Sequence, residues 1–160
     1  MRVLVDGYSL LHSWKRFTNR KTRSHSLQHK RDALIRILQQ YADHTGHRVT
    51  LVFDAYAAKH KPDIPEPTPG VEVIYSDKGK TADEAIERTV GEASQPAQIL
   101  VVTSDNLERT TVESLGARSM SGDLFEMEVN AAVKDLDTLV RRYGPRQRGS
   151  AAKVGDAFDE

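Results

Sequence analysis

Hydrophobic and polar residues fall into blocks along the chain, and the blocks follow two periods. Short apolar runs bounded by polar residues predict five strands. The predicted strands are residues 2–6, 48–54, 71–75, 98–103 and 117–120. Apolar residues at i, i+3, i+4 and i+7 predict the helices. The predicted helices are residues 27–43, 82–93, 104–115 and a long final helix that Ser121 caps and Gly144-Pro145 ends.

The alternation of strands and helices predicts an α/β fold with a mostly parallel sheet. The continuously apolar run of residues 99–102 is typical of a central strand covered on both faces. Right-handed crossovers place helices on both faces of such a sheet, and ligands bind beyond the carboxyl ends of its strands. Residues 55–70 are rich in proline and predict a surface loop.

Length and composition narrow the class of protein. The chain has 160 residues and no cysteine, which excludes a disulfide framework and a thiolate metal site. No apolar run approaches the roughly 18 residues of a membrane span. Residues 2–6 predict a strand rather than a signal peptide, so the expected location is cytoplasmic. We expect one domain over residues 1–144, followed by a disordered tail over residues 145–160.

The charges balance at 23 basic and 23 acidic residues, but they are segregated. Residues 12–31 and 141–153 are basic and contain no acid. The basic residues of the first segment are Lys15, Arg16, Arg20, Lys21, Arg23, Lys30 and Arg31. Such segments bind polyanions, or they simply keep the surface solvated. The charge pattern alone leaves both interpretations open.

Four aspartates are the candidate chemical groups. Asp6, Asp54 and Asp105 each follow a predicted strand, and parallel strands bring their carboxyl ends to one edge of the sheet. Asp83 lies at the start of the helix after the third strand. Converging carboxylates repel one another, and a hard divalent cation such as Mg²⁺ neutralises them and binds phosphate. The basic 12–31 segment and the loop at residues 59–61 would then hold the flanking phosphates of a nucleic acid.

Each of these acids also has a purely structural interpretation. Asp6-Gly7 fits a turn, Asp54 fits a plain strand end, and Asp105 fits a helix cap. Thr81-x-x-Glu84 fits a capping box, which gives Glu84 a structural role. Two aromatic residues near the inferred edge, Tyr8 and Trp14, either stack on a base or pack in the core. His25 and His29 are interpreted as solvated or RNA-facing rather than as zinc ligands.

The motifs around these acids resemble those of YacP-type NYN domains, a branch of the PIN-like nucleases. The opening motif is Val5-Asp6-Gly7-Tyr8-Ser9-Leu10-Leu11-His12, and it is followed in the family's order by Val52-Phe53-Asp54-Ala55, Thr81-Ala82-Asp83-Glu84 and Thr103-Ser104-Asp105. The resemblance covers roughly residues 1–140. One departure is Ser9, which stands where the family usually has Asn.

The resemblance implies a PIN-like three-layer sandwich with a five-stranded sheet ordered 3-2-1-4-5. It also implies endonucleolytic cleavage of RNA, with Asp6, Asp83 and Asp105 binding Mg²⁺ or Mn²⁺ and Asp54 assisting. Some relatives associate with the ribosome and cut messenger RNA there. Candidate substrate-binding residues are Ser9, Lys15, Arg16, Arg20, Lys21 and Arg23.

The sequence leaves three functional hypotheses. The first is a metal-dependent endoribonuclease that acts on single-stranded or messenger RNA. The second is a non-catalytic RNA- or ribosome-binding module on the same fold, which the Ser9 departure and the basic segments favour. The third, a phosphohydrolase with Asp6 as nucleophile, is disfavoured because its second Asp is expected at position 8, which is Tyr.

Overall fold

A five-stranded parallel sheet organises the molecule. The computed structural model describes residues 1–55 and 67–143. The strands are β1 (Arg2–Asp6), β2 (Arg48–Phe53), β3 (Val71–Tyr75), β4 (Ile99–Val102) and β5 (Arg118–Met120). Their order is β3-β2-β1-β4-β5 and every pair is parallel, which confirms the predicted fold class and strand order. The loop at residues 59–61 and the tail at 145–160 lie outside the described residues.

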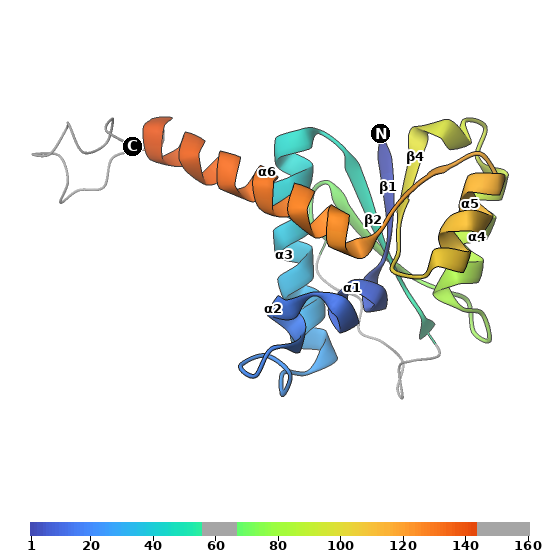
Figure 1. Ribbon diagram of the computed structural model, residues 1–160, viewed down its shortest axis with the longest axis horizontal. Helices are drawn as coiled ribbons and strands as arrows, with labels where there is room; N and C mark the ends of the chain where they lie inside the picture. The colour runs from blue at the N-terminus through green and yellow to red at the C-terminus, as the bar shows by residue number, and fades with distance from the viewer. Residues whose placement is uncertain (56–66, 144–160) are drawn as a thin grey trace, which may run out of the picture.

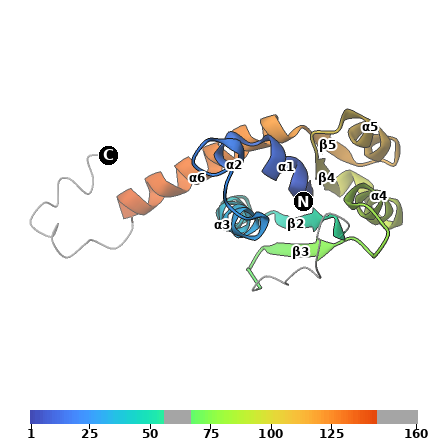
Figure 2. The same cartoon turned by 90° about the horizontal axis from the view of Figure 1, so that it is seen from below.

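Helices cover both faces of the sheet (Figures 1 and 2). They are α1 (Gly7–Ser13), α2 (Lys15–Thr18), α3 (Leu27–Thr45), α4 (Ala82–Glu92), α5 (Asn106–Ser114) and α6 (Gly122–Tyr143), with a 3₁₀ turn at Pro96–Gln98. Alternate side chains of β1 enter two separate cores. Val3 and Val5 pack with α1, α3 and α6, whereas Leu4 packs with α4 and α5. The result is the expected three-layer sandwich.

Capping residues set the helix ends where the sequence predicts them. The hydroxyl of Ser26 accepts a hydrogen bond from the His29 N–H at 3.1 Å, and Thr81 does the same for Glu84 at 3.1 Å. Gly46 ends α3 in the left-handed conformation with φ 75°, which glycine adopts without steric cost. β2 ends at Phe53, one residue earlier than predicted, because the Phe53 carbonyl accepts the last pairing bond, from Ser76 N–H at 2.9 Å.

The segment after β1 differs from the prediction. Asp6-Gly7 is not a turn into a loop: the Asp6 side chain caps α1, which begins at Gly7. Gly7 is required there by close packing, since a Cβ at this position would lie 2.2 Å from the Phe53 ring. The start of α1 is therefore pressed against the end of β2.

Trp14 packs in the core and does not stack on a base. Its side chain is fully buried, and its indole N–H donates to the Gly122 carbonyl at 3.1 Å. This bond joins the α1–α2 junction to the start of α6, so Trp14, one of the two aromatic candidates, is structural. No helix among the described residues is both long and apolar enough to cross a membrane.

Candidate active site

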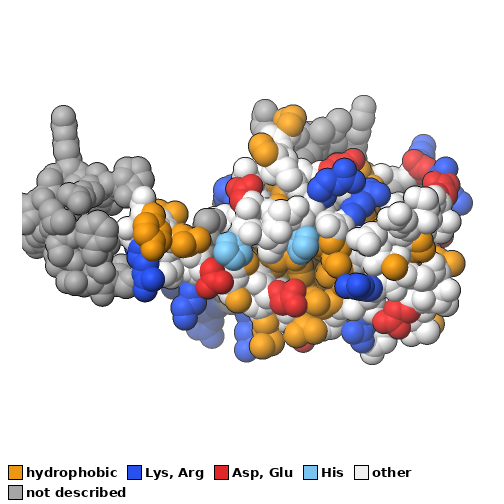
Figure 3. Space-filling model, turned by 90° about the horizontal axis from the view of Figure 1, so that it is seen from above, with side chains coloured by type: hydrophobic (Ala, Val, Ile, Leu, Met, Phe, Trp, Pro, Cys, Tyr) orange, Lys and Arg blue, Asp and Glu red, His pale blue; other side chains and the backbone are white. Residues whose placement is uncertain are grey.

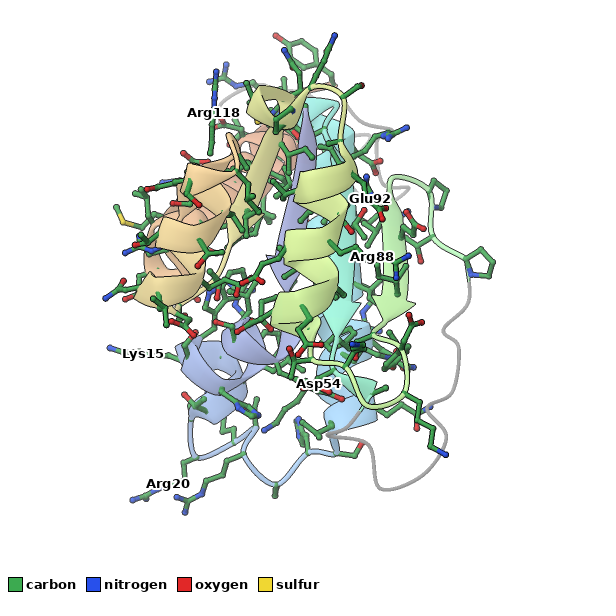
Figure 4. All side chains as sticks on the ribbon, turned by 90° about the vertical axis from the view of Figure 1, so that its right-hand side faces the viewer. Lys15, Arg20, Asp54, Arg88, Glu92 and Arg118 are labelled. Carbon is green, nitrogen blue, oxygen red and sulfur yellow. The ribbon has the colours of Figure 1, made fainter. Side chains whose placement is uncertain are left out.

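The carboxyl ends of the strands meet at one end of the molecule, the lower end in Figure 1. Asp6 is the last residue of β1, and Asp54 follows β2 at the lower end of Figure 4. Asp105 caps α5 after β4, and Asp83 lies in the first turn of α4. Each acid comes from a different segment of the chain, and the parallel sheet brings all four to this edge.

Asp6 lies at the centre of the acid cluster, which we define as Asp6, Asp54, Asp83 and Asp105. The pKa of Asp6 is raised to about 6, and burial is the largest cause. A hydrogen bond from the Ser9 N–H lowers this pKa, and the charges of Asp83, Asp54 and Asp105, in that order, contribute to raising it. The cluster is thus a set of carboxylates close enough to repel one another.

Capping and clustering are compatible at this site. Asp6 Oδ1 accepts from the Ser9 N–H at 3.3 Å, so the first turn of α1 orients this carboxylate. Asp105 Oδ1 accepts from the N–H groups of Leu107 at 2.9 Å and Glu108 at 3.4 Å. Both bonds to Asp105 use the same oxygen. The cap interpretation is therefore correct for Asp105, while Asp6 caps α1 where a turn was expected, and both caps hold their carboxylates at the edge.

Glu108 is a member of the site that the sequence analysis missed. Glu108 is only 3% exposed, and its Oε1 is buried without a hydrogen-bond partner in the described part of the chain. Burial, then the charge of Asp83 and a hydrogen bond to it, raise the pKa of Glu108 to about 9. Glu108 therefore keeps its proton at neutral pH and donates it in a hydrogen bond to Asp83.

Asp83 is held between opposing influences. Burial raises the pKa of Asp83, the Glu108 hydrogen bond lowers it, and the charges of Asp105 and Asp54 raise it.

A signal for Glu108 was present in the sequence. Asp105, Glu108 and Val112 are spaced at i, i+3 and i+7, so Glu108 lies on the inward face of α5 with the buried Val112.

Ser9 connects two parts of the site. Its hydroxyl oxygen accepts a hydrogen bond from the Ser104 N–H at 2.8 Å, across 95 residues of sequence. Ser104 precedes Asp105, and Ser9 itself lies in the helix that Asp6 caps. This bond therefore joins the segment that carries Asp6 to the segment that carries Asp105.

The basic turn, residues 19–23, lies at the same end of the molecule as the acid cluster. The Asn19 side-chain oxygen accepts from the N–H groups of Lys21 at 2.9 Å and Thr22 at 3.0 Å, which gives the turn a defined shape. Its three basic side chains are exposed, as is that of Lys15, and Figure 4 shows Lys15 and Arg20 at the same end as Asp54. The basic residues of the turn are Arg20, Lys21 and Arg23.

Two other basic residues of the 12–31 segment are bound within the fold. Arg16 donates to Asn130 Oδ1 at 2.6 Å and lies 3.9 Å from Glu126, which docks α2 on α6. Arg31 is buried and donates to the hydroxyl of Tyr75 at 3.0 Å. The interpretation of this segment as uniformly solvated is wrong at Arg31.

Other surfaces carry mixed charge. A groove of about 680 Å³ lies between β3 and α4, but its Arg88 pairs with Asp77 and Glu92. Figure 4 shows Arg88 and Glu92 together on α4. Seen from the end opposite the acid cluster, basic, acidic and apolar side chains are interspersed (Figure 3). Among the residues that the structure describes, the basic turn is thus the charged surface that best suits a polyanion near the acids.

The acid cluster is not a preformed cage for a metal. Within residues 1–55 and 67–143, no group of three or more Asp, Glu or His side chains is arranged to hold an ion. The neighbouring rings of His25 and His29 therefore do not belong to such a group either. The donor set still fits a hard divalent cation. It consists of mutually repelling carboxylates, and Mg²⁺ is usually held by one or two of these together with waters and substrate phosphate.

Comparison with known proteins places this chain in a family. Residues 3–157 match the YacP-like NYN domain. The chain belongs to the YacP-like NYN domain family. It is 33% identical over 141 residues to the uncharacterized protein YacP of Bacillus subtilis strain 168, covering 88% of this chain and 81% of that one.

Solved structures of the family agree with the fold described above. Two crystal structures of Rae1 (YacP) from Bacillus subtilis, one of them a mutant, superpose with TM-scores of 0.73 and 0.74 at 30% identity. The matches cover 98% and 97% of this chain, and 91% and 84% of the Rae1 chains. NYN domains have a PIN-like nuclease fold, so this NYN domain has a nuclease-type, RNA-related role. Nucleases of this type typically use divalent metal ions.

Proposed function

We propose that this NYN domain is a metal-dependent endoribonuclease that cleaves phosphodiester bonds of single-stranded RNA, including messenger RNA. The observation that supports this most strongly is the acid cluster. Three aspartates from three other segments each raise the pKa of Asp6 through their charge. A fold that only needed stability would gain nothing from such repulsion.

Three members of the cluster would hold Mg²⁺ or Mn²⁺: Asp6, Asp83 and Asp105. Asp54 would assist beside them. When bound, such an ion lowers the pKa of water and stabilises negative charge on a phosphate. The chain has no cysteine, and the proposed reaction needs no covalent nucleophile from the protein.

The chain's own side chains position the reacting groups. Glu108 keeps its proton and donates to Asp83, which fixes the orientation of that carboxylate. The bond from Ser104 to Ser9 joins the segments that carry Asp6 and Asp105. Arg20, Lys21 and Arg23 would contact backbone phosphates on one side of the cleaved bond, because a flexible RNA strand follows basic surface.

Cleavage of a single-stranded RNA in Mg²⁺ or Mn²⁺ tests the proposal. Asp6→Asn and Asp83→Asn are each expected to lower the rate roughly 100-fold or more, because they remove charge at the reacting phosphate. Asp43→Asn is the matched control, since Asp43 is exposed near the end of α3, away from the cluster. Cleavage in EDTA, or full activity in both site variants, would contradict the proposal.

A non-catalytic RNA- or ribosome-binding module is the second candidate. Two observations favour it: Ser9 in place of the family's usual Asn, and the lack of a preformed three-ligand metal site among the described residues. It predicts salt-sensitive binding to RNA or to purified ribosomes without turnover, and binding that does not change when Mn²⁺ is added.

A further inference from the structure

A row of aromatic rings crosses the sheet edge beside the acid cluster. The Tyr8 ring meets the Phe53 ring edge-on, with centroids 4.9 Å apart, and stacks with His12 at 6.1 Å and 27°. Phe53 in turn lies 5.7 Å from Tyr75. The row therefore runs from α1 to β3, over the end of β2.

The rings differ in their exposure. Phe53 is 1% exposed and forms a rigid floor, which Gly7 packs against directly. Tyr8 is half-buried, and His12 is exposed. Because Tyr8 and His12 are four residues apart on α1, they lie on the same face of that helix. The stacked pair thus packs on a buried ring at Tyr8 and is exposed to solvent at His12.

The position of Tyr8 links this pair to the acid cluster. Tyr8 comes two residues after Asp6, and Asp54, Tyr75 and Arg31 are near enough to influence it electrostatically. Arg31 is fixed by its bonds to Tyr75 and Asp32. A nucleotide whose phosphate lay at the acid cluster would therefore carry its base within reach of the Tyr8 and His12 rings.

We propose that Tyr8 and His12 form a stacking platform for one unpaired base of the RNA, next to the phosphodiester bond at the acid cluster. The proposal rests on the function proposed above and adds a base-binding subsite to it. A base inside a duplex has both faces covered by its neighbours, so this platform takes single-stranded RNA. Stacking accepts any base, because every base has a π face.

Fluorescence of 2-aminopurine tests the platform without any cleavage. We would titrate the protein in EDTA into short single-stranded RNA oligomers, each with one 2-aminopurine at a different position. Stacking on an aromatic ring quenches this base. We expect quenching with the wild-type protein and with Tyr8→Phe, which keeps the ring, and we expect it wherever the oligomer can place the 2-aminopurine on the platform.

Two variants and one control make the result specific. Tyr8→Leu keeps apolar contact with Phe53 but removes the ring, and is expected to abolish the quenching and weaken binding about tenfold. His12→Ala changes an exposed side chain, so it tests the platform without endangering the fold, and is expected to reduce the quenching. Tyr143→Leu, at a tyrosine 76% exposed at the far end of α6, is expected to change neither (Figure 1).

The outcomes separate this inference from the nuclease proposal. Equal quenching in wild type, Tyr8→Leu and His12→Ala would overturn the platform, as would quenching at no position in the wild-type protein. If that happened while the wild-type protein cleaved RNA in Mn²⁺, the nuclease proposal would stand alone. Ring-dependent quenching without cleavage in any metal would leave the platform and overturn the nuclease.

Discussion

At the scale of single residues, the site depends on groups that hold the acids rather than on the acids alone. Ser9 and Glu108 are the two such residues in the described structure, one a neutral hydroxyl and the other a buried carboxyl. The sequence names Ser9 only as a substrate-binding candidate, through the resemblance to the family, and it does not single out Glu108. Both act by fixing the position of an aspartate.

Ser9 substitutions test the first of these. Ser9→Ala removes the bond to the Ser104 N–H, and we expect it to lower the free energy of unfolding by about 1 kcal/mol and to reduce cleavage. Ser9→Asn restores an acceptor oxygen at the residue type usual in the family, so we expect it to retain or raise activity. Thermal unfolding and cleavage rates measure the two effects. An alanine variant that cleaves like wild type would show that the bond has no positioning role.

Glu108 predicts an unusual pH dependence of stability in the metal-free protein. The folded-state pKa values of Glu108 and Asp6 are raised, to about 9 and about 6. Their contribution to stability is therefore complete below the ordinary carboxyl pKa and is lost as pH rises through the raised values. We expect the melting temperature in EDTA to fall between pH 5 and pH 9.

Glu108→Gln removes most of this dependence, since an amide does not titrate and still donates to Asp83. We expect the variant to exceed wild type in stability by roughly 1–3 kcal/mol at pH 8 and to match it more closely at pH 5. Glu72→Gln, at an exposed position of β3, is the control. A wild-type protein whose stability rises steadily from pH 5 to pH 9 would contradict the assignment of a protonated, buried Glu108.

At the scale of the elements, α1 is the helix that builds the site. It begins directly after Asp6, and it carries Tyr8, Ser9 and His12. Its position depends on the contact of Gly7 with the Phe53 ring. The positions of the residues that α1 carries at this edge of the sheet thus depend on one close contact between α1 and β2.

Two matched glycine substitutions test this contact. Gly7→Ala places a Cβ 2.2 Å from a buried ring atom, and we expect it to destabilise the protein by roughly 1–3 kcal/mol. Gly91→Ala, in α4, meets nothing within 4 Å, and we expect it to stabilise by about 0.5–1 kcal/mol through helix propensity. Denaturant unfolding measures both. The same sign for the two variants would show that Phe53 adapts and that the close approach is not a constraint.

Most elements could be predicted because periodicity and capping agree in them. Ser26, Thr81 and Gly46 set the ends of α3 and α4 as expected. α1 was missed because Asp-Gly also suits a turn and because a helix this short shows barely two turns of periodicity. Glu108 was missed because the candidate acids were those at strand ends and helix starts, whereas this acid lies one helical turn into α5.

At the scale of the whole molecule, the net charge is neutral, but one end carries two surfaces of opposite charge. The acid cluster and the basic turn lie together, and Figure 4 shows Arg118 at the other end of the molecule. The pattern of the sequence predicted parallel strands, but the strand order came only from the resemblance to the family. Where the acids meet depends on that order, which periodicity does not encode.

The basic turn predicts a measurable salt effect. Arg20→Gln with Arg23→Gln removes two charges near the acids, and the slope of log affinity against log salt for single-stranded RNA should fall by about 1.4. The control pair, Arg48→Gln with Arg118→Gln, makes the same change of net charge at the amino ends of β2 and β5, and should leave the slope nearly unchanged. Equal slopes for the two pairs would place the RNA elsewhere.

The position of a bound metal tests the central claim, that the four aspartates form one cation-binding centre. A crystal grown or soaked in Mn²⁺ and measured near the manganese absorption edge would show it directly. We expect an anomalous peak bonded to at least one of Asp6, Asp83 and Asp105, and its loss in the Asp6→Asn and Asp83→Asn variants. No peak at this edge in saturating Mn²⁺, or a peak only at other residues, would contradict the claim.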